Sequence, residues 1–293
     1  MQLGLALLER LPGDVVLSPY GLARALRVIR DGATGETRRA LEAIEDVPDV
    51  PGVLSAQAAW LAPEYAPGPK LTLDTGPLEL DAINAWSDEK TRGMIPRILD
   101  SLSDDEIAVI TDAEYLDAKW RQPFENTRKA PFEGAGEVDM MRVEGRFEHA
   151  DDAVRLPYRE HDLHLVAMLG EWHDVQWRTG HGTVELPRFT TTSSFELDRL
   201  LGLNLDAGHD LDALIEGPGD KALGRILQRA RVDVDEEGTR AAATTAATMR
   251  VVSMPLDPFH IVFDRPFTWA VEHAPTGTPL FVGRVLNPTQ RRD

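Results

Sequence analysis

A run of small, uncharged residues near the end of the chain constrains the fold more than any other feature. Residues 232–235 alternate between Val and Asp, which is typical of a strand with one buried face. From 239 to 248 the chain then contains only Ala and Thr besides Arg240. This run lacks the large apolar side chains that anchor a core, yet alternate Ala and Thr residues enter a sheet at little cost. We therefore expect a segment that suits two environments and moves between them.

Composition and charge exclude several classes of function. The chain has 293 residues, 42% of them hydrophobic, which is enough for a large core. Its 49 acidic and 31 basic residues leave a net charge of -18, which argues against nucleic acid or an anionic membrane as a partner. The absence of cysteine excludes disulfides, thiol catalysis and cysteine-ligated metals. No apolar run is long enough to predict a membrane span.

The first ten residues predict a short amphipathic helix. They are apolar, but they lack the basic region and the small-residue cleavage site of a secretion signal. The sequence therefore favours a cytoplasmic location, or an extracellular one if a leader has been removed, and leaves the choice open.

The hydrophobic pattern predicts a mixed α+β domain over residues 1–293. Ser18 and Pro19 form a cap followed by a proline at the first helical position. Further helices are expected over 36–44, 78–86, 92–102, 195–201 and 210–215. Strands are expected over 54–61, 71–74 and 107–120, in several runs from 138 to about 169 that include 154–158 and 163–169, and over 184–189, 226–234, 261–263, 269–273 and 280–285. No internal repeat or long linker divides the chain, which favours one domain.

No residue pattern predicts an enzyme, a metal site or a cofactor. His161 and His164 are three residues apart on an expected strand, so their side chains point to opposite faces. Ser18 lacks the Gly-x-Ser-x-Gly elbow of a nucleophile. No pair of carboxylates stands out for acid–base catalysis, and most acidic residues of such a chain are solvated surface.

Short motifs are spread in order over nearly the whole chain. They are Val16-Leu17-Ser18-Pro19 with residues 32–37; Ile83-Asn84-Ala85-Trp86 with Thr91, Gly93 and Ile95; Tyr115, Trp120, Phe124, Thr127 and Phe132; Leu156-Pro157-Tyr158; Leu186-Pro187-Arg188-Phe189; Asp264-Arg265-Pro266-Phe267; and residues 283–289. Each motif alone is weak. Together, in this order, they resemble the serpin family.

The resemblance implies a fold and a mechanism. The expected fold has a large mixed β-sheet, smaller sheets with packed helices, and a mobile hinge and reactive-centre loop at about 236–258. Serpins are suicide substrates of serine proteases: after cleavage and acylation the loop inserts as a new middle strand of the large sheet. The implied partner is a serine protease in a covalent acyl complex, and the chain itself is expected to be a monomer. For the Ala/Thr run, the alternative to a hinge is a flexible linker. For the whole protein, the alternative to an inhibitor is a non-inhibitory serpin-fold binding or structural protein.

The resemblance also assigns the hinge. Its residues are Glu237, Gly238, Thr239, Ala241, Ala242, Ala243 and Thr244. If Thr239 and Ala241 face into the sheet, Arg240 stays in solvent, because side chains alternate along a strand. Gly238 is expected to give the backbone freedom to turn at the point of insertion.

The position of the reactive bond follows from the spacing in the family. Counting from Gly238 places it between Val252 and Ser253, where a small β-branched residue suits elastase-like or subtilisin-like proteases. Arg250, followed by Val251, is the competing position and favours trypsin-like proteases. Met254 is a third choice.

The chain departs from the family in two shortened segments, residues 45–80 and 169–184, and in its shutter. Residues 45–80 are too few for the helices usually found there, so some peripheral helices are expected to be missing. The lost region includes the helix that binds heparin in some relatives, which, with the net charge, argues against heparin as a cofactor. The breach and shutter residues are expected to be Trp120, Ser18, Asp112 and Gln228. Asp112 and Gln228 stand where Asn and His are usual, and are expected to pair, while Gly21 stands where a second Ser is usual.

Overall fold

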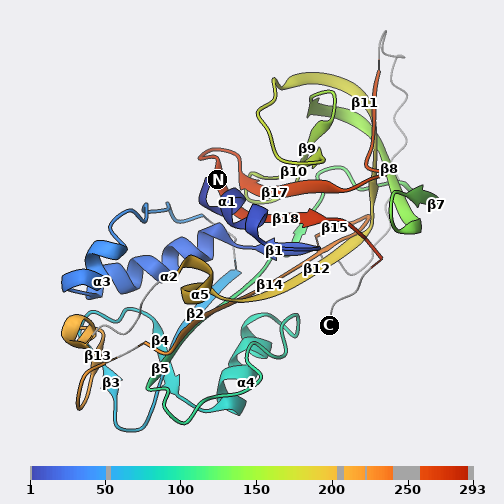
Figure 1. Ribbon diagram of the computed structural model, residues 1–293. Helices are drawn as coiled ribbons and strands as arrows, with labels where there is room; N and C mark the ends of the chain where they lie inside the picture. Colours follow the sequence, from blue (N-terminus) through green and yellow to red (C-terminus); the bar gives the residue numbers. More distant parts are fainter. Residues whose placement is uncertain (1, 51–53, 203–207, 222, 240–257, 290–293) are drawn as a thin grey trace.

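The computed structural model describes residues 2–50, 54–202, 208–221, 223–239 and 258–289. Its strands form sheets of nine, seven and two strands, here called sheets A, B and C. Helices lie against the sheets on the outside of the molecule (Figure 1). This is the expected α+β architecture of large sheets with few helices.

Sheet A is largely antiparallel, and its one parallel pair among the described strands joins β11 to β16. It contains the last strands of the chain beside strands from the middle. Its members, in order across the sheet, are β1 (Val15–Leu17), β18 (Thr278–Val285), β17 (Phe267–His273), β10 (Leu163–Leu169), β9 (Ala153–Pro157), β8 (Gly136–His149), β11 (Arg178–Pro187) and β16 (Phe259–Val262), with β7 (Asn126–Phe132) paired to β8.

Sheet B is mixed and contains Thr239, the first residue of the Ala/Thr run. Parallel pairs join β2 to β4 and β5 to β14, and the other pairs are antiparallel. Its order is β4 (Asp74–Pro77), β2 (Leu54–Leu61), β5 (Ala108–Tyr115), β14 (Arg225–Val234), β15 (Gly238–Thr239) and β6 (Ala118–Lys119), with β12 (Phe189–Glu196) paired to β14. Sheet C pairs β3 (Ala66–Pro67) with β13 (Ile215–Glu216).

The helices are short and few. They are α1 (Gln2–Arg10), α2 (Pro19–Gly32), α3 (Gly35–Ala40), α4 (Leu80–Lys90), α5 (Leu197–Leu201) and a 3-10 turn at Gly208–Leu211. The described residues between α3 and α4 form strands and loops without a helix, in agreement with the expected trimming. Within the described residues, none of these helices has the length and apolarity needed to cross a membrane.

Sheet B is sandwiched between α2 and α4, so every residue of β5 is buried. On one face, Val109 and Ala113 pack with Ile83 of α4. On the other face, Ile110 packs in a cluster that contains Leu22 and Leu26 of α2. Alternation along a strand places Asp112 and Glu114 on the same face as Ile110, beneath α2.

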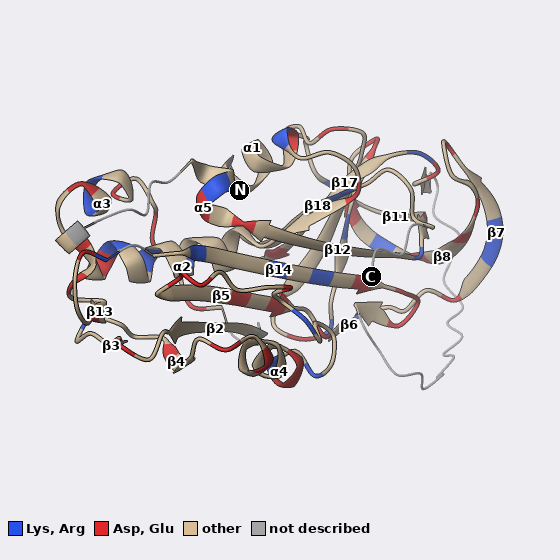
Figure 2. Ribbon diagram, turned by 60° about the horizontal axis from the view of Figure 1, so that its bottom comes forward, with Lys and Arg blue, Asp and Glu red and all other residues tan. Residues whose placement is uncertain are grey.

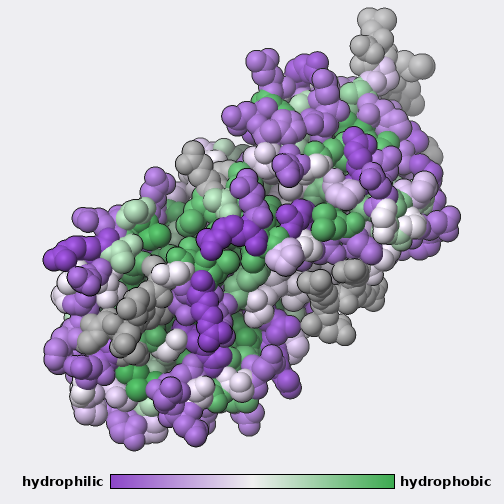
Figure 3. Space-filling model, in the orientation of Figure 1, coloured by the Kyte–Doolittle hydropathy of each residue, from purple (hydrophilic) through white to green (hydrophobic). Residues whose placement is uncertain are grey.

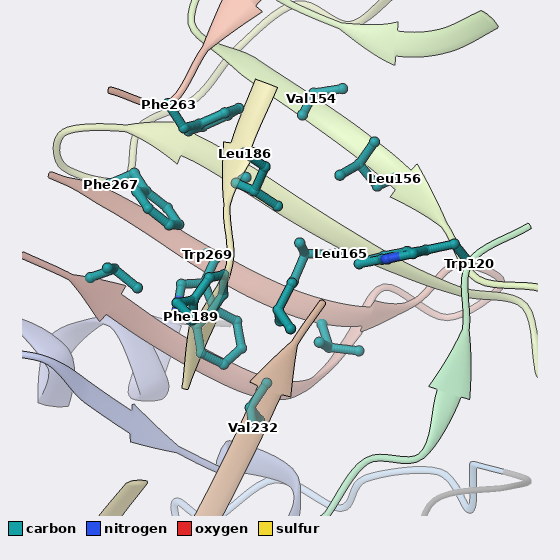
Figure 4. Packing of buried hydrophobic residues seen from close by; sticks show 14 of the residues in the cluster. Trp120, Val154, Leu156, Leu165, Leu186, Phe189, Val232, Phe263, Phe267 and Trp269 are labelled. Atoms are coloured by element: carbon teal, nitrogen blue, oxygen red, sulfur yellow. The ribbon is translucent and has the colours of Figure 1, made fainter. Parts of the chain in front are cut away.

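A second core joins sheet A to the end of sheet B where β14 finishes. Trp269 and Leu165 of sheet A pack in one cluster with Trp120 and with Val232 of β14 (Figure 4). Deep burial of large side chains at this end stabilises the strand ends, by about 1.5–3 kcal/mol for each side chain of this size.

The expected helix at 92–102 is wrong. Thr91 Oγ1 accepts a hydrogen bond from Ile95 N at 2.8 Å, and Asn84 Oδ1 accepts from Ile98 N at 2.9 Å and from Leu99 N at 3.1 Å. Gly93 has a φ of +80°. Side chains of the preceding helix therefore bind the backbone groups that helical bonds would use, and the segment folds as turns.

The expected long strand at 107–120 is also wrong, because it breaks into β5 and β6. β5 pairs with β14 up to Tyr115, whereas β6 pairs with β15. The short strand β15 lies between β14 and β6 and separates the two halves. Strands β7 and β12 were missed, the strand expected at 71–74 lies at Asp74–Pro77, and the helix expected at 210–215 is only the 3-10 turn.

Candidate functional site

The chain reverses direction directly after β14. Asp235 organises the turn: one of its carboxylate oxygens accepts hydrogen bonds from Glu237 N at 2.8 Å and from Gly238 N at 3.1 Å. Asp235 N donates to Gly238 O at 2.9 Å. The turn brings Thr239 opposite Val234, so β14 and β15 form an antiparallel hairpin.

Gly238 is needed for a reason other than the expected one. Its φ is not in the positive region where glycine is favoured. A Cβ at this position would instead lie 2.2 Å from Ala118 O and 2.7 Å from the Cα of Lys119. The prediction that Gly238 supplies turning freedom is therefore corrected: it allows β15 to approach the backbone of β6.

Thr239 is fully buried, with 0% of its surface exposed. Its Oγ1 lies 2.6 Å from the hydroxyl oxygen of Tyr158. Burial raises the pKa of Tyr158, so the phenol stays protonated and available for this hydrogen bond. The side chain of Thr239 therefore faces inward, as the expected register requires for the first residue of the run.

Trp120 lies beside this contact. Its ring stacks on Tyr158 with centroids 4.4 Å apart and an interplanar angle of 11°. Its indole N–H donates to Asp235 O at 2.8 Å, and its backbone N–H donates to Glu237 O at 2.9 Å. Trp120 thus binds both ends of the turn and links it to sheet A.

Glu236 holds the outer side of the turn. Arg188 Nη2 donates to its two carboxylate oxygens at 2.5 and 2.7 Å, and the Thr127 hydroxyl donates to the same group. Phe124 N donates to Glu236 O at 2.9 Å. The ion pair is half exposed, so its contribution to stability is at most about 1 kcal/mol.

The contact between β5 and β14 is here called the seam. The strand β15 is aligned with this seam. β15 is antiparallel to β14 and to β6, and β5 runs parallel to β14. A strand that continued from Thr239 would therefore run antiparallel to both sides of the seam. The seam is closed in this structure by the pairing of residues 225–231 with 109–115 (Figure 2).

A network of buried polar groups lies under the middle of the seam. Gln228 of β14 donates from Nε2 to Asp112 Oδ2 of β5 at 2.7 Å and to Ser18 O at 3.0 Å. Its Oε1 accepts from Ser18 N at 2.9 Å. The expected hydrogen bond between Asp112 and Gln228 is therefore present, and it crosses the seam.

Ser18 has the predicted capping role. Its hydroxyl oxygen accepts from Gly21 N at 3.0 Å, in the first turn of α2, and its O–H donates to Leu280 O at 2.7 Å. The cap thereby fixes the start of α2 against β18 of sheet A and against Gln228 of sheet B.

Gly21 leaves space for two carboxylates. A Cβ on Gly21 would lie 2.1 Å from Glu114 Oε1 and 2.3 Å from Asp112 Oδ2. A serine cannot occupy this position while both acids are buried next to it. The glycine at position 21, where Ser is usual, and the two acids in β5 therefore depend on each other, because the carboxylates fill the space that a side chain at 21 would need.

Glu114 is a residue of this site that the sequence analysis missed. It is 0% exposed, and burial followed by the charge of Asp112 raises its pKa well above the usual range. Burial also raises the pKa of Asp112 to about 6, although the Gln228 and Gln57 amides oppose this. The available signal was spacing: two acids two residues apart on an expected strand share one face.

The remaining predicted site residues lie outside the described residues. They are Ala241, Ala242, Ala243, Thr244, Arg250, Val251, Val252, Ser253 and Met254. Over the described ranges, no group of three or more His, Asp or Glu side chains is placed to hold a metal.

The chain is similar in sequence to known proteins. A family model described as "Serpin (serine protease inhibitor)" matches residues 70–288. An uncharacterised serpin-like protein of Thermococcus kodakarensis is 30% identical over 239 residues, which cover 70% of this chain and 56% of the relative. Bovine leukocyte elastase inhibitor is 30% identical over 252 residues, which cover 70% of this chain and 66% of the relative. The chain thus spans less than two thirds of the length of these curated relatives.

Solved structures show the same fold. Serpin48 of the insect Tenebrio molitor has a TM-score of 0.81 at 21% identity, with 98% of this chain and 95% of that chain covered. Human thyroxine-binding globulin complexed with its ligand has a TM-score of 0.83 at 18% identity, with 98% and 96% covered. At these identities the likeness concerns the fold alone.

Proposed function

Because the chain belongs to the serpin family, we propose that it inhibits serine proteases as a suicide substrate. The segment after Thr239 is offered to the protease, which cleaves it and becomes acylated. The free end of the segment then inserts along the seam and carries the protease across the molecule, where its active site is distorted. The chain acts as one domain and as a monomer, without heparin, since its net charge of -18 repels a polyanion.

One observation supports this proposal: Gly238 and Thr239, directly before the segment proposed to insert, form a strand of sheet B. Thr239 is buried between β14 and β6. β15 has the antiparallel direction that an inserted strand needs on both sides. Insertion would extend an existing hairpin, so its first step needs no new turn.

The composition of residues 241–248 supports insertion. Ala241 and Ala243 have the same parity as the inward-facing Thr239, so two small side chains would enter next on the α2 face of sheet B. No charged residue lies in 241–248, and burying one there would cost several kcal/mol. Arg240 has the opposite parity, so its side chain would point to the face of sheet B opposite to α2.

The alternative is a binding protein of the same fold that does not trap proteases. The apolar cavity beside β2 and β5 has a volume of about 10 Å³, lined by residues such as Leu61, Ile110 and Leu214. This is room for about one water molecule, whereas small-molecule sites measure roughly 300–1,000 Å³. The cavity therefore does not favour a small-molecule carrier over an inhibitor.

The test is a covalent complex that survives denaturing electrophoresis. We expect one after incubation with an elastase-like or subtilisin-like protease. Ala243→Arg places a charge at an inward position and should convert the inhibitor into a substrate that is cleaved without a complex. Ala242→Arg makes the same chemical change at an outward position and should retain the complex.

Two outcomes would contradict the proposal. Cleavage of the unmodified chain without any complex would support the non-inhibitory alternative, and equal loss in both Arg variants would reject the register. The new N-terminus of the released fragment locates the reactive bond. Ser253 supports Val252–Ser253, whereas Val251 supports cleavage after Arg250 by a trypsin-like protease.

A further inference from the structure

Two carboxylates lie close together in the core beneath the seam. Asp112 and Glu114 are both 0% exposed and lie on the α2 face of β5. Since Asp112 Oδ2 and Glu114 Oε1 lie 2.3 and 2.1 Å from a single point, the ideal Cβ position of Gly21, they are at most about 4.4 Å apart. Carboxylates at such a distance disfavour double ionisation.

The two acids differ in the donors around them. Gln228 donates to Asp112 Oδ2 at 2.7 Å, and Gln57 donates to Asp112 Oδ1 at 3.1 Å. Both oxygens of Asp112 therefore accept an amide N–H, which suits its ionised form. Among the described residues, no amide or cation donates to either carboxylate oxygen of Glu114. The hydroxyls of Ser18 and Ser55 lower its pKa, but by less than burial and the charge of Asp112 raise it.

The elements packed around the pair supply little compensating charge. β2 places Ser55 and Gln57 opposite Glu114 and Asp112, and β14 places Ala230 and Gln228 there. These four side chains are neutral. The N-terminus of α2 adds Ser18, whose hydroxyl is engaged with Gly21 N and Leu280 O.

The one charged side chain that acts on both acids from these elements is Arg24 of α2. It lowers the pKa of both carboxyls, but its effect is the smallest for each. Its guanidinium lies over the ring of Tyr20, 5.4 Å from the centroid, and it forms no salt bridge to either acid in the described part of the chain. Arg24 therefore does not neutralise the pair.

We propose that Asp112 and Glu114 bind one proton at neutral pH, held on Glu114, and that loss of this proton favours separation of β5 from β14. A second negative charge here would be buried beside a first one, with no amide or cation bound to it. Opening the seam would hydrate both carboxylates. The closed sheet would thus be a pH-sensitive state, whether or not the chain inhibits a protease.

The direction of the pH effect follows from the raised pKa of Glu114. Below the ordinary pKa of a carboxyl group, Glu114 is neutral in both the closed and the unfolded states, and its titration adds no cost. The free-energy cost of ionising Glu114 in the closed sheet grows as the pH rises from the ordinary carboxyl pKa to the raised pKa. Above the raised pKa this cost is complete. The closed sheet should therefore lose stability as the solution becomes alkaline.

The first experiment is urea unfolding of the intact chain between about pH 5 and about pH 9, with Glu114→Gln as the test variant. Gln removes the titrating group and keeps the size of the side chain. At alkaline pH its unfolding equilibrium constant should be smaller than that of the unmodified chain by about tenfold or more, since one pKa unit corresponds to a factor of ten. The exposed Glu89→Gln is the matched control and should follow the unmodified chain. Equal pH slopes for the unmodified chain and Glu114→Gln would reject the proton site.

Infrared spectroscopy tests the proton directly in the unmodified chain. A protonated carboxylic acid has a carbonyl band distinct from that of a carboxylate. We expect this band at neutral pH in the unmodified chain and in Glu89→Gln, and its loss in Glu114→Gln. Its absence from the unmodified chain would overturn the proposal even if the Gln variant failed to fold.

Hydrogen exchange locates the effect in the sheet. Backbone amides of β5 and β14 should exchange faster in the unmodified chain than in Glu114→Gln at alkaline pH, with both measured at the same pH so that the chemical rate cancels. Equal exchange at these strands would show that the proton does not control the seam.

Discussion

At the scale of single residues, crowding by neighbouring atoms explains why two positions of the site are glycine. Gly238 and Gly21 have no positive φ, yet a Cβ on either would overlap its neighbours. For Gly21 the neighbours are the ends of two side chains, which can move. For Gly238 they are backbone atoms of β6, which cannot move without displacing a strand. Gly238 should therefore be the less tolerant position.

Gly238→Ala should destabilise the folded chain by about 1–3 kcal/mol, the usual cost of overpacking. The added methyl meets Ala118 O and the backbone of Lys119, so β15 must leave its place between β14 and β6. Urea unfolding measures the loss. The neighbouring Glu237→Ala keeps every backbone hydrogen bond of the turn and should stay within about 0.5 kcal/mol. Equal stability of the two variants would contradict the close-approach role of Gly238.

At the scale of elements, the seam between β5 and β14 controls any insertion. The two strands are parallel neighbours, joined by backbone pairing and by Gln228 bonded to Asp112. A strand entering between them must break both. Because the chain has no cysteine, an engineered pair would be its only thiols and could lock the seam reversibly.

Ala113→Cys with Arg229→Cys should form such a lock. These residues are direct partners across the seam, and neighbouring strands lie about 4.8 Å apart, within the range for a disulfide. The oxidised variant should be cleaved by a target protease without a covalent complex, and reduction should restore the complex. Arg229→Cys alone loses its hydrogen bond to Arg97 O and controls for that change. Complex formation by the oxidised variant would show that this seam need not open.

At the scale of the whole molecule, stability should be lower before insertion than after it. Sheet B gives only Gly238 and Thr239 to β15 in the described structure, while β5 and β14 remain paired. The surface is strongly charged: hydrophilic residues cover much of the face in Figure 3, and Leu3 and Leu286 are the exposed large hydrophobics among the described residues. Acidic residues, red in Figure 2, are spread over both helices and strands.

Cleavage within residues 240–257 should raise the Tm of the chain by roughly 20 °C. About ten newly ordered residues at about 1 kcal/mol for each hydrogen bond would add about 10 kcal/mol, and each 1 kcal/mol raises the Tm of a large domain by about 2 °C. Calorimetry before and after limited proteolysis measures the change. A cut chain whose two pieces melt together at the original temperature would mean that no strand enters the sheet.

The sequence by itself determined the family, the α+β class and the cap at Ser18, because these depend on local patterns and on short motifs in a fixed order. It also predicted that Asp112 and Gln228 pair and that Thr239 faces inward, because strand periodicity is a local property. The function of the hinge and the position of the reactive bond stay predictions.

Only the tertiary structure decided how these parts meet. The break between β5 and β6, the contact of Thr239 with Tyr158, and the crowding of Gly21 by Asp112 and Glu114 join residues that are distant in the chain. Alternation places Glu114 on one face of a strand. It does not show that α2 buries that face or that no amide or cation binds the carboxylate there. The physical reason is that burial and hydrogen-bond partners are set by packing between elements, which no local pattern contains.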